Sequence, residues 1–222
     1  MQRSVPICLT LLLLALSAHA QDDDSPGFNE STFEGLEMRG IGPSMMSGRI
    51  ADIVIHPDDP STWYVGVGSG GIWKTENGGT TWTTIFDNED AYSIGSITLD
   101  PNDPDVVWVG TGENVSGRHV AYGAGVYRSR DGGKTWDNMG LGDSEHIGMI
   151  RIDPRDSNVI YVAAQGPLWS AGGERGLYKS TDGGETWARI LGDGLGNTEL
   201  DDQYTGVSEV LSLIHISEPT RL

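Results

Sequence analysis

The residues best suited to chemistry gather in one polar segment, GTGENVSGRHVAYGAG, which runs from Gly110 to Gly125. It contains a carboxylate, an amide, two basic side chains and an aromatic ring, at Glu113, Asn114, Arg118, His119 and Tyr122. This set could hydrogen-bond and stack against a polar ligand, and long polar loops on a rigid scaffold are where binding groups collect. The alternative is structural, because Glu113 and Arg118 could form an ion pair that only holds the loop.

Four further residues are candidates for ligand contact. Trp169 and Arg175 lie in a second long segment, Gln165 to Gly176, and could add a stacking face and a cation. Arg49 and His146 each stand immediately before the first predicted strand of a repeat, so we expect both at one mouth of a central channel. Each could contact an anionic ligand group or be a structural residue with a polar partner.

The elements that must position these residues are marked by a motif that occurs three times. It reads hydroxyl, any residue, Asp or Asn, Gly, Gly, any residue, Thr, Trp, and we call each copy a box turn. The box-turn residues are Thr75, Asn77, Gly78, Gly79 and Trp82 in the first copy, Ser129, Asp131, Gly132, Gly133 and Trp136 in the second, and Ser180, Asp182, Gly183, Gly184 and Trp187 in the third. The glycine pair supplies the positive φ angles of a tight hairpin turn, and the polar side chains can bond the turn's own amides. We therefore expect these residues to be structural, with each tryptophan starting the return strand and offering an apolar face to bury.

Alignment on the box turns gives a repeat of roughly fifty residues, a period typical of propeller blades and solenoids. Each repeat is predicted to form four short strands: Ile50 to Ile55, Trp63 to Val67, Gly71 to Lys74 and Trp82 to Phe86; Ile94 to Leu99, Val107 to Thr111, Gly125 to Arg128 and Trp136 to Met139; Ile147 to Ile152, Ile160 to Ala164, Gly176 to Lys179 and Trp187 to Ile190. A fourth unit begins at Val207, and Gly35 to Pro43 is predicted to be a closing strand. The sequence thus predicts an all-β fold, an incomplete β-propeller of about three four-stranded antiparallel blades.

The ends of the chain give four expected regions. Residues 1–20 combine Arg3, an apolar run and Ala18-His19-Ala20, the pattern of a secretory signal peptide, and nothing after them is apolar enough to span a membrane. Residues 21–34 are predicted to be a flexible acidic leader, and residues 35–210 the partial propeller. Residues 211–222, LSLIHISEPTRL, resemble a translated adaptor of sequencing libraries and are expected to be foreign to the protein, which would make the chain a fragment.

Composition narrows the partners. The formal net charge of −18 repels nucleic acid and anionic lipid surfaces, so neither is expected to bind. Cys8, the single cysteine, lies in the predicted signal peptide, which leaves no disulfide after cleavage. We expect no cofactor and no metal, because the carboxylates of Asp22 to Asp24 are consecutive and lack the spacing of a calcium loop. The expected partner is an extracellular protein, peptide or glycan.

Several stretches carry a resemblance to known families: GPSMMSGRI, WVGTGENVSGRH, GVYRSRDGGKTW, SEHIGMIRIDP and AAQGPLWSAGGERGLYKSTDGGETW. The box turns resemble Asp-boxes, also called BNR repeats, and the chain is most similar to large secreted bacterial proteins with a sortilin N-terminal type propeller, often labelled glycosyl hydrolases. The sortilin resemblance implies peptide or protein binding in the propeller tunnel. Our main hypothesis is therefore a secreted, non-catalytic scaffold that binds protein, peptide or glycan at its loop face.

The alternative hypothesis is a glycoside hydrolase of xyloglucanase or sialidase type, with catalytic residues partly outside this chain. Xyloglucanases of this fold carry a catalytic aspartate in a TDIGG-like segment after the second strand of an early blade. The corresponding segment here is VGSGG, which places Gly68 where that aspartate would be. In the sialidase comparison, Arg49 could be one of three arginines that surround a substrate carboxylate. No catalytic residue is assigned from the sequence.

Overall fold

The computed structural model describes residues 48–115, 120–191 and 205–211. All of these lie in one compact unit, Gly40–Leu222, and a second unit, Met1–Arg39, lies outside the described residues. The predicted signal peptide, acidic leader and closing strand also lie outside the described residues, as does the predicted tail beyond Leu211. No helix in the described ranges has the length and apolar character needed to cross a membrane.

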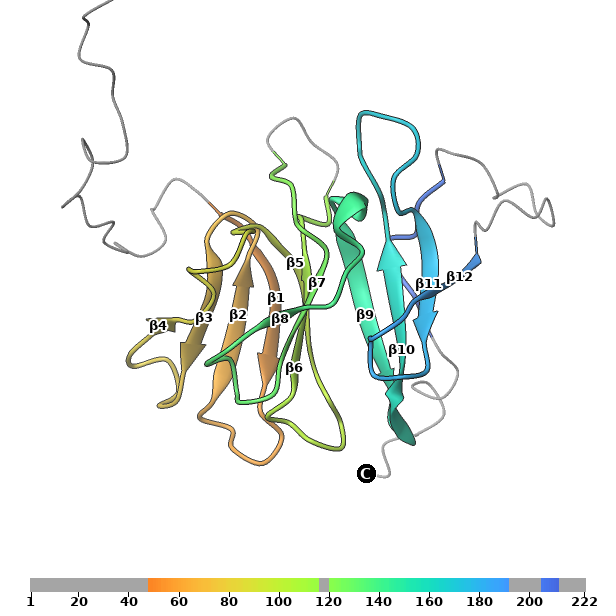
Figure 1. The fold of residues 1–222 in the computed structure, drawn as a ribbon. Helices are drawn as coiled ribbons and strands as arrows, with labels where there is room; N and C mark the ends of the chain where they lie inside the picture. Colours follow the sequence, from red (N-terminus) through yellow and green to blue (C-terminus); the bar gives the residue numbers. More distant parts are fainter. Residues whose placement is uncertain (1–47, 116–119, 192–204, 212–222) are drawn as a thin grey trace, which may run out of the picture. The chain divides into compact units, whose positions relative to one another are not determined.

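Twelve strands form three four-stranded antiparallel sheets (Figure 1). The first sheet contains β1 (Ile50–Ile55), β2 (Trp63–Val67), β3 (Gly71–Thr75) and β4 (Thr83–Thr84). The second contains β5 (Ile94–Leu99), β6 (Val107–Thr111), β7 (Val126–Ser129) and β8 (Asp137–Asn138), and the third β9 (Ile147–Asp153), β10 (Asp156–Ala164), β11 (Gly176–Ser180) and β12 (Ala188–Leu191). In each sheet the spatial order follows the sequence order, which confirms the predicted four-stranded blades.

The box turns form the hairpins between the third and fourth strands, as predicted. In the third box turn, the Ser180 hydroxyl accepts a hydrogen bond from the amide of Gly184 at 2.8 Å. The Asp182 carboxylate accepts one from the amide of Thr186 at 2.9 Å and another from its hydroxyl at 2.6 Å. The hydrogen bonds from the Thr186 hydroxyl and amide lower the pKa of Asp182 to about 2. The glycine pair takes φ angles of 73° and 88°, which only glycine adopts without strain.

The box-turn tryptophans differ from the prediction in one respect. Trp136 and Trp187 precede short fourth strands and donate from Nε1 to a backbone carbonyl of the preceding blade, each at 2.7 Å. These two tryptophan rings therefore pack between neighbouring blades rather than inside their own blade. Trp82 has no preceding blade among the described residues, donates to Gly79 of its own turn and is 39% exposed. The fourth strands β4 and β8 are shorter than predicted, because regular pairing with the third strand ends two residues after each tryptophan.

The core lies between neighbouring sheets. Two apolar clusters form this core. The cluster between the first and second sheets consists of Tyr64, Ile72, Phe86, Ile94, Ile97, Val107, Val109 and Tyr127. The cluster between the second and third sheets consists of Trp108, Val126, Met139, Leu141, Ile147, Ile150, Ile152, Ile160, Val162, Ala164 and Tyr178. The first strands lie side by side, with β5 in contact with both β1 and β9. A Cβ atom on Gly95 of β5 would lie 2.3 Å from the carbonyl oxygen of Ile147, so the blades approach too closely there for a larger residue.

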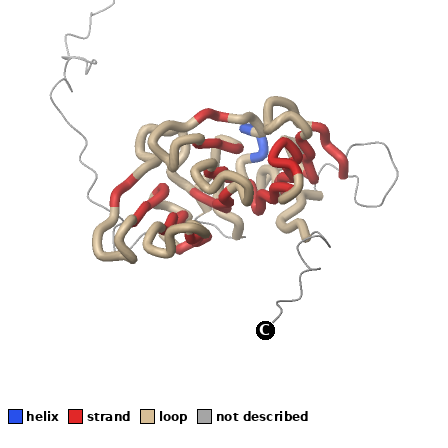
Figure 2. The backbone as a smooth tube through the Cα atoms, turned by 90° about the horizontal axis from the view of Figure 1, so that it is seen from below, coloured by secondary structure: helices blue, strands red, loops and turns tan. Residues whose placement is uncertain are grey.

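Figure 2 shows the described strands from below, in red, with the loops that connect them in tan. The short 3-10 turn η2 (Gly142–Ser144), blue in that view, connects the second blade to the third. Residues 205–211 continue beyond the third blade, where the amide of Val207 donates to the carbonyl of Ala164 at 2.9 Å. No strand is assigned at residues 205–211, so the fourth unit expected from Val207 stays a prediction.

Candidate functional site

The candidate residues lie at the end of the blades opposite the box turns. Each box turn is tied to the turn between the first and second strands of its own blade, for example by the bond from the amide of Gly132 to the carbonyl of Asp105. The connections between second and third strands, and the approaches to the first strands, therefore share the other end, which we call the loop face. Arg49 precedes β1, Glu113 follows β6 and His146 precedes β9, so all three belong to the loop face.

An ion pair between Arg49 and Glu113 bridges the first and second blades. Nε and Nη2 of Arg49 lie 2.7 and 2.6 Å from Oε1 of Glu113. The arginine side chain is 60% exposed, whereas that of Glu113 is 4% exposed. The other carboxylate oxygen, Oε2, is buried and has no hydrogen-bond partner among the described residues. Buried polar atoms without a partner are rare, so Oε2 retains unused acceptor capacity among the described residues.

The Glu113 carboxylate fills the space that a side chain at position 68 would need. A Cβ atom on Gly68 would lie 2.3 Å from Oε1 and 2.7 Å from Cδ of Glu113. The backbone of Gly68 is held in place because its amide donates to the carbonyl of Arg49 at 2.7 Å and its carbonyl accepts from the Ser93 hydroxyl at 2.6 Å. The Glu113 carboxylate, on the loop of the second blade, thus occupies the position at which a side chain on residue 68 would begin.

A buried histidine lies near this carboxylate. His146 is fully buried, and neither ring nitrogen has a hydrogen-bond partner among the described residues. Burial lowers the pKa of His146, and the nearby carbonyl and carboxylate of Glu113 act in the opposite direction. The ring of Tyr122, which is 56% exposed, lies 5.7 Å from the imidazole between ring centres. The lowered pKa makes neutral imidazole the dominant form at neutral pH, a form that can both donate and accept a hydrogen bond.

Asn114 connects the loop of the second blade to the third. Its amide nitrogen donates to the carbonyl of Gly148 at 3.1 Å, and its amide oxygen accepts from Nε2 of Gln165. Two amide side chains therefore link the loop that carries Glu113 to the start of the long loop after β10. Gln165 was not predicted as a site residue, since a single amide at the start of a loop gives no pattern in the sequence.

The two candidates from the third blade have different surroundings. The guanidinium of Arg175 is buried and donates to carbonyl groups of its own loop, those of Gln165, Pro167, Ser170 and Gly172. Arg175 therefore holds the loop in shape, whereas the sequence offered it as a cation for ligand contact. Trp169 lies on that loop and is 70% exposed, so its ring faces solvent.

The structure thus brings Arg49, Glu113 and His146 together, with Tyr122 beside the histidine. Arg118 and His119 lie outside the described residues, so the ion pair expected between Glu113 and Arg118 is not tested. In the part of the chain that the structure describes, no three His, Cys, Asp or Glu side chains form a group able to hold a metal ion. The arrangement suits a neutral ligand rich in hydroxyl groups, because it combines a carboxylate acceptor, an imidazole and exposed aromatic faces.

Comparison with known proteins gives a consistent set of relatives. No family model matches the chain. A xyloglucanase of Hypocrea jecorina is 30% identical over 160 residues, which cover 64% of this chain and 18% of that protein. A xyloglucanase of Acetivibrio thermocellus is 29% identical over 164 residues, covering 68% of this chain and 18% of that protein. The chain therefore spans less than a fifth of the length of these two relatives.

Solved structures support the architecture. An ancestral GH74 enzyme matches with a TM-score of 0.52 and 22% identity, over 68% of this chain and 20% of that one. The GH74 enzyme of Niastella koreensis matches with a TM-score of 0.50 and 23% identity, over 64% of this chain and 21% of that one. At these identities the likeness shows the fold alone. The three described sheets are therefore blades of an incomplete β-propeller. The relatives that share this similarity are named as glycoside hydrolases that act on xyloglucan.

Proposed function

We propose that the chain is part of a secreted, glycoside hydrolase-like β-propeller whose loop face binds a polysaccharide of the xyloglucan class. The named relatives act on xyloglucan, which supports this class of ligand. Secretion is supported by the signal-peptide pattern at residues 1–20. Between our two sequence-based hypotheses, these relatives favour the glycoside hydrolase over a non-catalytic protein binder.

The observation that carries the proposal is the Glu113 carboxylate in the space beside Gly68. The related xyloglucanases are expected to place a catalytic carboxylate at that position of the fold, and here Glu113 fills the space from a neighbouring blade. Its buried oxygen Oε2 has no partner among the described residues, and the proposal requires that a saccharide hydroxyl group reach it and donate a hydrogen bond. Glycoside hydrolysis generally needs two carboxyl groups, of which Glu113 would be one. The described residues therefore support saccharide binding directly, and hydrolysis requires a second carboxyl group.

Exposed aromatic rings support a saccharide in preference to a small anion. Trp169 and Tyr122 each present a ring to solvent on loops of the loop face. Such rings can cover the apolar faces of sugar residues while hydroxyl groups remain free to bond polar side chains. An anionic ligand is disfavoured, because the guanidiniums of Arg49 and Arg175 are already bonded to Glu113 and to loop carbonyls.

Calorimetric titration of the chain with xyloglucan oligosaccharides tests the proposal. Glu113→Gln should weaken binding about tenfold or more, the usual worth of a hydrogen bond to a charged group, and Trp169→Ala should also weaken it. Asp58→Asn is the matched control, since it removes one exposed carboxylate in the turn between β1 and β2, at the opposite end. Equal binding by all variants, or preferential binding of unrelated peptides, would contradict the proposal.

An assay for released reducing ends separates binding from catalysis. Hydrolysis that disappears in Glu113→Gln, while the oligosaccharide still binds, would assign Glu113 a direct part in the reaction. Binding without any hydrolysis would show that this chain supplies saccharide binding but not the second carboxyl group.

A further inference from the structure

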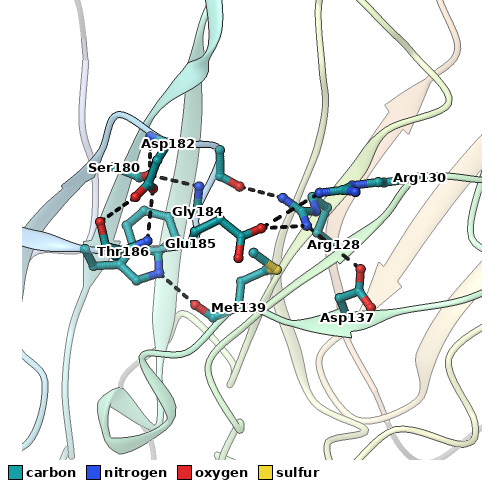
Figure 3. A network of polar contacts seen from close by, with 11 residues as sticks. Arg128, Arg130, Asp137, Met139, Ser180, Asp182, Gly184, Glu185 and Thr186 are labelled. Carbon is teal, nitrogen blue, oxygen red and sulfur yellow. Dashed lines mark hydrogen bonds and ion pairs between the residues drawn. The ribbon is translucent and has the colours of Figure 1, made fainter.

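Adjacent blades are joined by a repeated set of contacts that we call a latch. In the second blade, Nη1 of Arg128 donates to the carbonyl of Gly183, in the box turn of the third blade, at 2.6 Å. Glu185 of the same turn lies 3.4 Å from Nη2, and the guanidinium lies 5.4 Å from the ring centre of Trp108. Figure 3 shows Arg128 reaching toward the turn that carries Gly184 and Glu185. The latch thus joins a cation on a third strand to the first glycine of the following box turn.

The first blade carries the same cation and aromatic ring at matching positions. Lys74 of β3 donates to the carbonyl of Gly132, in the second box turn, at 3.2 Å. Its ammonium lies 5.3 Å from the ring centre of Tyr64, the residue directly paired with it on β2. Trp108 and Arg128 are paired in the same way on β6 and β7. In both blades the aromatic ring beneath the latch is buried, with exposures of 1% and 2%.

Each latch also has an apolar side, three residues after the box-turn tryptophan. The carbonyl of Ile85 accepts from Nε1 of Trp136, and that of Met139 accepts from Nε1 of Trp187. The second glycine of the incoming turn packs on the same residue. A Cβ atom on Gly133 would lie 2.5 Å from Cδ1 of Ile85, so a larger residue there would displace the end of the Ile85 side chain.

The third blade carries every part of a latch but receives no turn within the described residues. Lys179 lies 5.4 Å from the ring centre of Tyr161, and the two are paired across β10 and β11. No described carbonyl accepts a hydrogen bond from Lys179. Ile190, the counterpart of Ile85 and Met139, is 45% exposed, and Tyr161 is partly exposed instead of buried.

The segment at residues 205–211 packs against the third blade, which carries this unfilled latch. A Cβ atom on Gly148 would lie 2.3 Å from the carbonyl oxygen of Ser208, as one on Gly95 would lie 2.3 Å from that of Ile147. Ser208 therefore takes, beside the third blade, the place that Ile147 takes beside the second. The inner edge of the third blade is thus covered by the segment that contains Ser208.

We infer that Tyr161, Lys179 and Ile190 form a docking site for the glycine pair and tryptophan of a further box turn, carried by a blade whose first strand begins at residues 205–211. The glycine carbonyl of that turn accepts from Lys179. Its tryptophan donates to the carbonyl of Ile190, and both apolar surfaces become buried. This site is separate from the loop face and from saccharide binding.

Lys179→Ala in two chains tests the inference. The first is the 222-residue chain, and the second is an extended chain in which the residues after Ser208 are replaced by a second copy of residues 148–210. This junction keeps the register shown by Ser208 and supplies one more box turn. Lys179→Ala should leave the unfolding midpoint of the first chain unchanged and lower that of the second by about 3–12 °C. Lys134→Ala, at an exposed position of a box turn, is the matched control and should change neither midpoint.

Three outcomes would overturn the inference. One is an extended chain that fails to unfold cooperatively although the 222-residue chain does so. Another is an equal effect of Lys179→Ala in both chains. The third is self-association of the 222-residue chain that is lost in both Lys179→Ala and Trp82→Ala, which would assign the docking site to the first box turn of a second copy. A cooperative extended chain with a midpoint sensitive to Lys179 alone supports the further blade.

Discussion

Replacing Gly68 by alanine tests whether the Glu113 carboxylate occupies the space assigned to it. The φ angle of Gly68 is outside the left-handed region, so alanine adds no backbone strain there. The new Cβ would lie 2.3 Å from Oε1 of Glu113, far inside van der Waals contact. Because that oxygen ends a side chain with rotatable bonds, the carboxylate should move aside and lose its bonds to Arg49.

The expected loss in the free energy of unfolding follows from the hydrogen bonds to Arg49 that the Glu113 carboxylate loses. A hydrogen bond to a charged group contributes about 1.5–3 kcal/mol, and the 60% exposed Arg49 side chain regains water when the pair breaks, which reduces the net cost to about 1–2 kcal/mol. Glu113→Ala removes the same interaction, so it should cost about as much. The double variant should then cost about as much as either single variant, which leaves a coupling energy of about 1–2 kcal/mol.

Urea unfolding followed by tryptophan fluorescence measures all four proteins of this cycle. Gly142→Ala is a suitable control, since a Cβ atom there would meet only the carbonyl of Ala124 at 3.7 Å, an ordinary contact. That variant should unfold with the midpoint of the unchanged chain. If the costs of Gly68→Ala and Glu113→Ala add in the double variant, the two residues do not share one space and our description of the site is wrong.

Three further predictions concern the box turns and the latches. Arg128→Ala should lower the free energy of unfolding by about 1.5–3 kcal/mol in urea titrations, whereas Arg130→Ala, whose side chain is 63% exposed, should change it by less than about 1 kcal/mol. The pKa of Asp131 is lowered to about 2 by hydrogen bonds from the Thr135 hydroxyl and amide, so its contribution to stability is complete above the unfolded-state pKa of about 4 and is lost as pH falls toward 2. Acid titration of Asp131→Asn should therefore show a smaller loss of stability over this pH range, and an unchanged loss would contradict the assignment. Trp187→Phe should cost about 1 kcal/mol in thermal or urea unfolding through its lost bond to a neighbouring blade, while Trp169→Phe should cost almost nothing because that ring is 70% exposed.

Most of the fold could be predicted from the sequence because its information is local. The glycine pair and the Asp or Asn two positions after the hydroxyl define each hairpin, and the strands on either side follow from alternation and β-branched residues. The exceptions occur where tertiary contacts decide. β10 begins at Asp156, four residues before the predicted strand, since its start pairs with Asp153 in a tight turn.

The candidate site was only partly predictable, because its main contact joins residues 64 positions apart. Sequence placed Arg49 and His146 at one end of the blades, and the structure places Glu113 with both. The sequence identified Glu113 as chemically suitable for a site. Its pairing with Arg49 could not be predicted, because that contact depends on how the first and second blades pack. Gly68 was the available sign, since the absence of a side chain there leaves the room that the Glu113 carboxylate fills.

The latches have a consequence for how the chain comes apart. Each one couples a blade only to the next, so the described blades form a linear array with nearest-neighbour coupling. The second blade is held from both sides, and the first and third each from one side among the described residues. Amide hydrogen exchange should therefore be slowest in β6 and β7 and faster in the outer blades, which can open without disturbing the middle one.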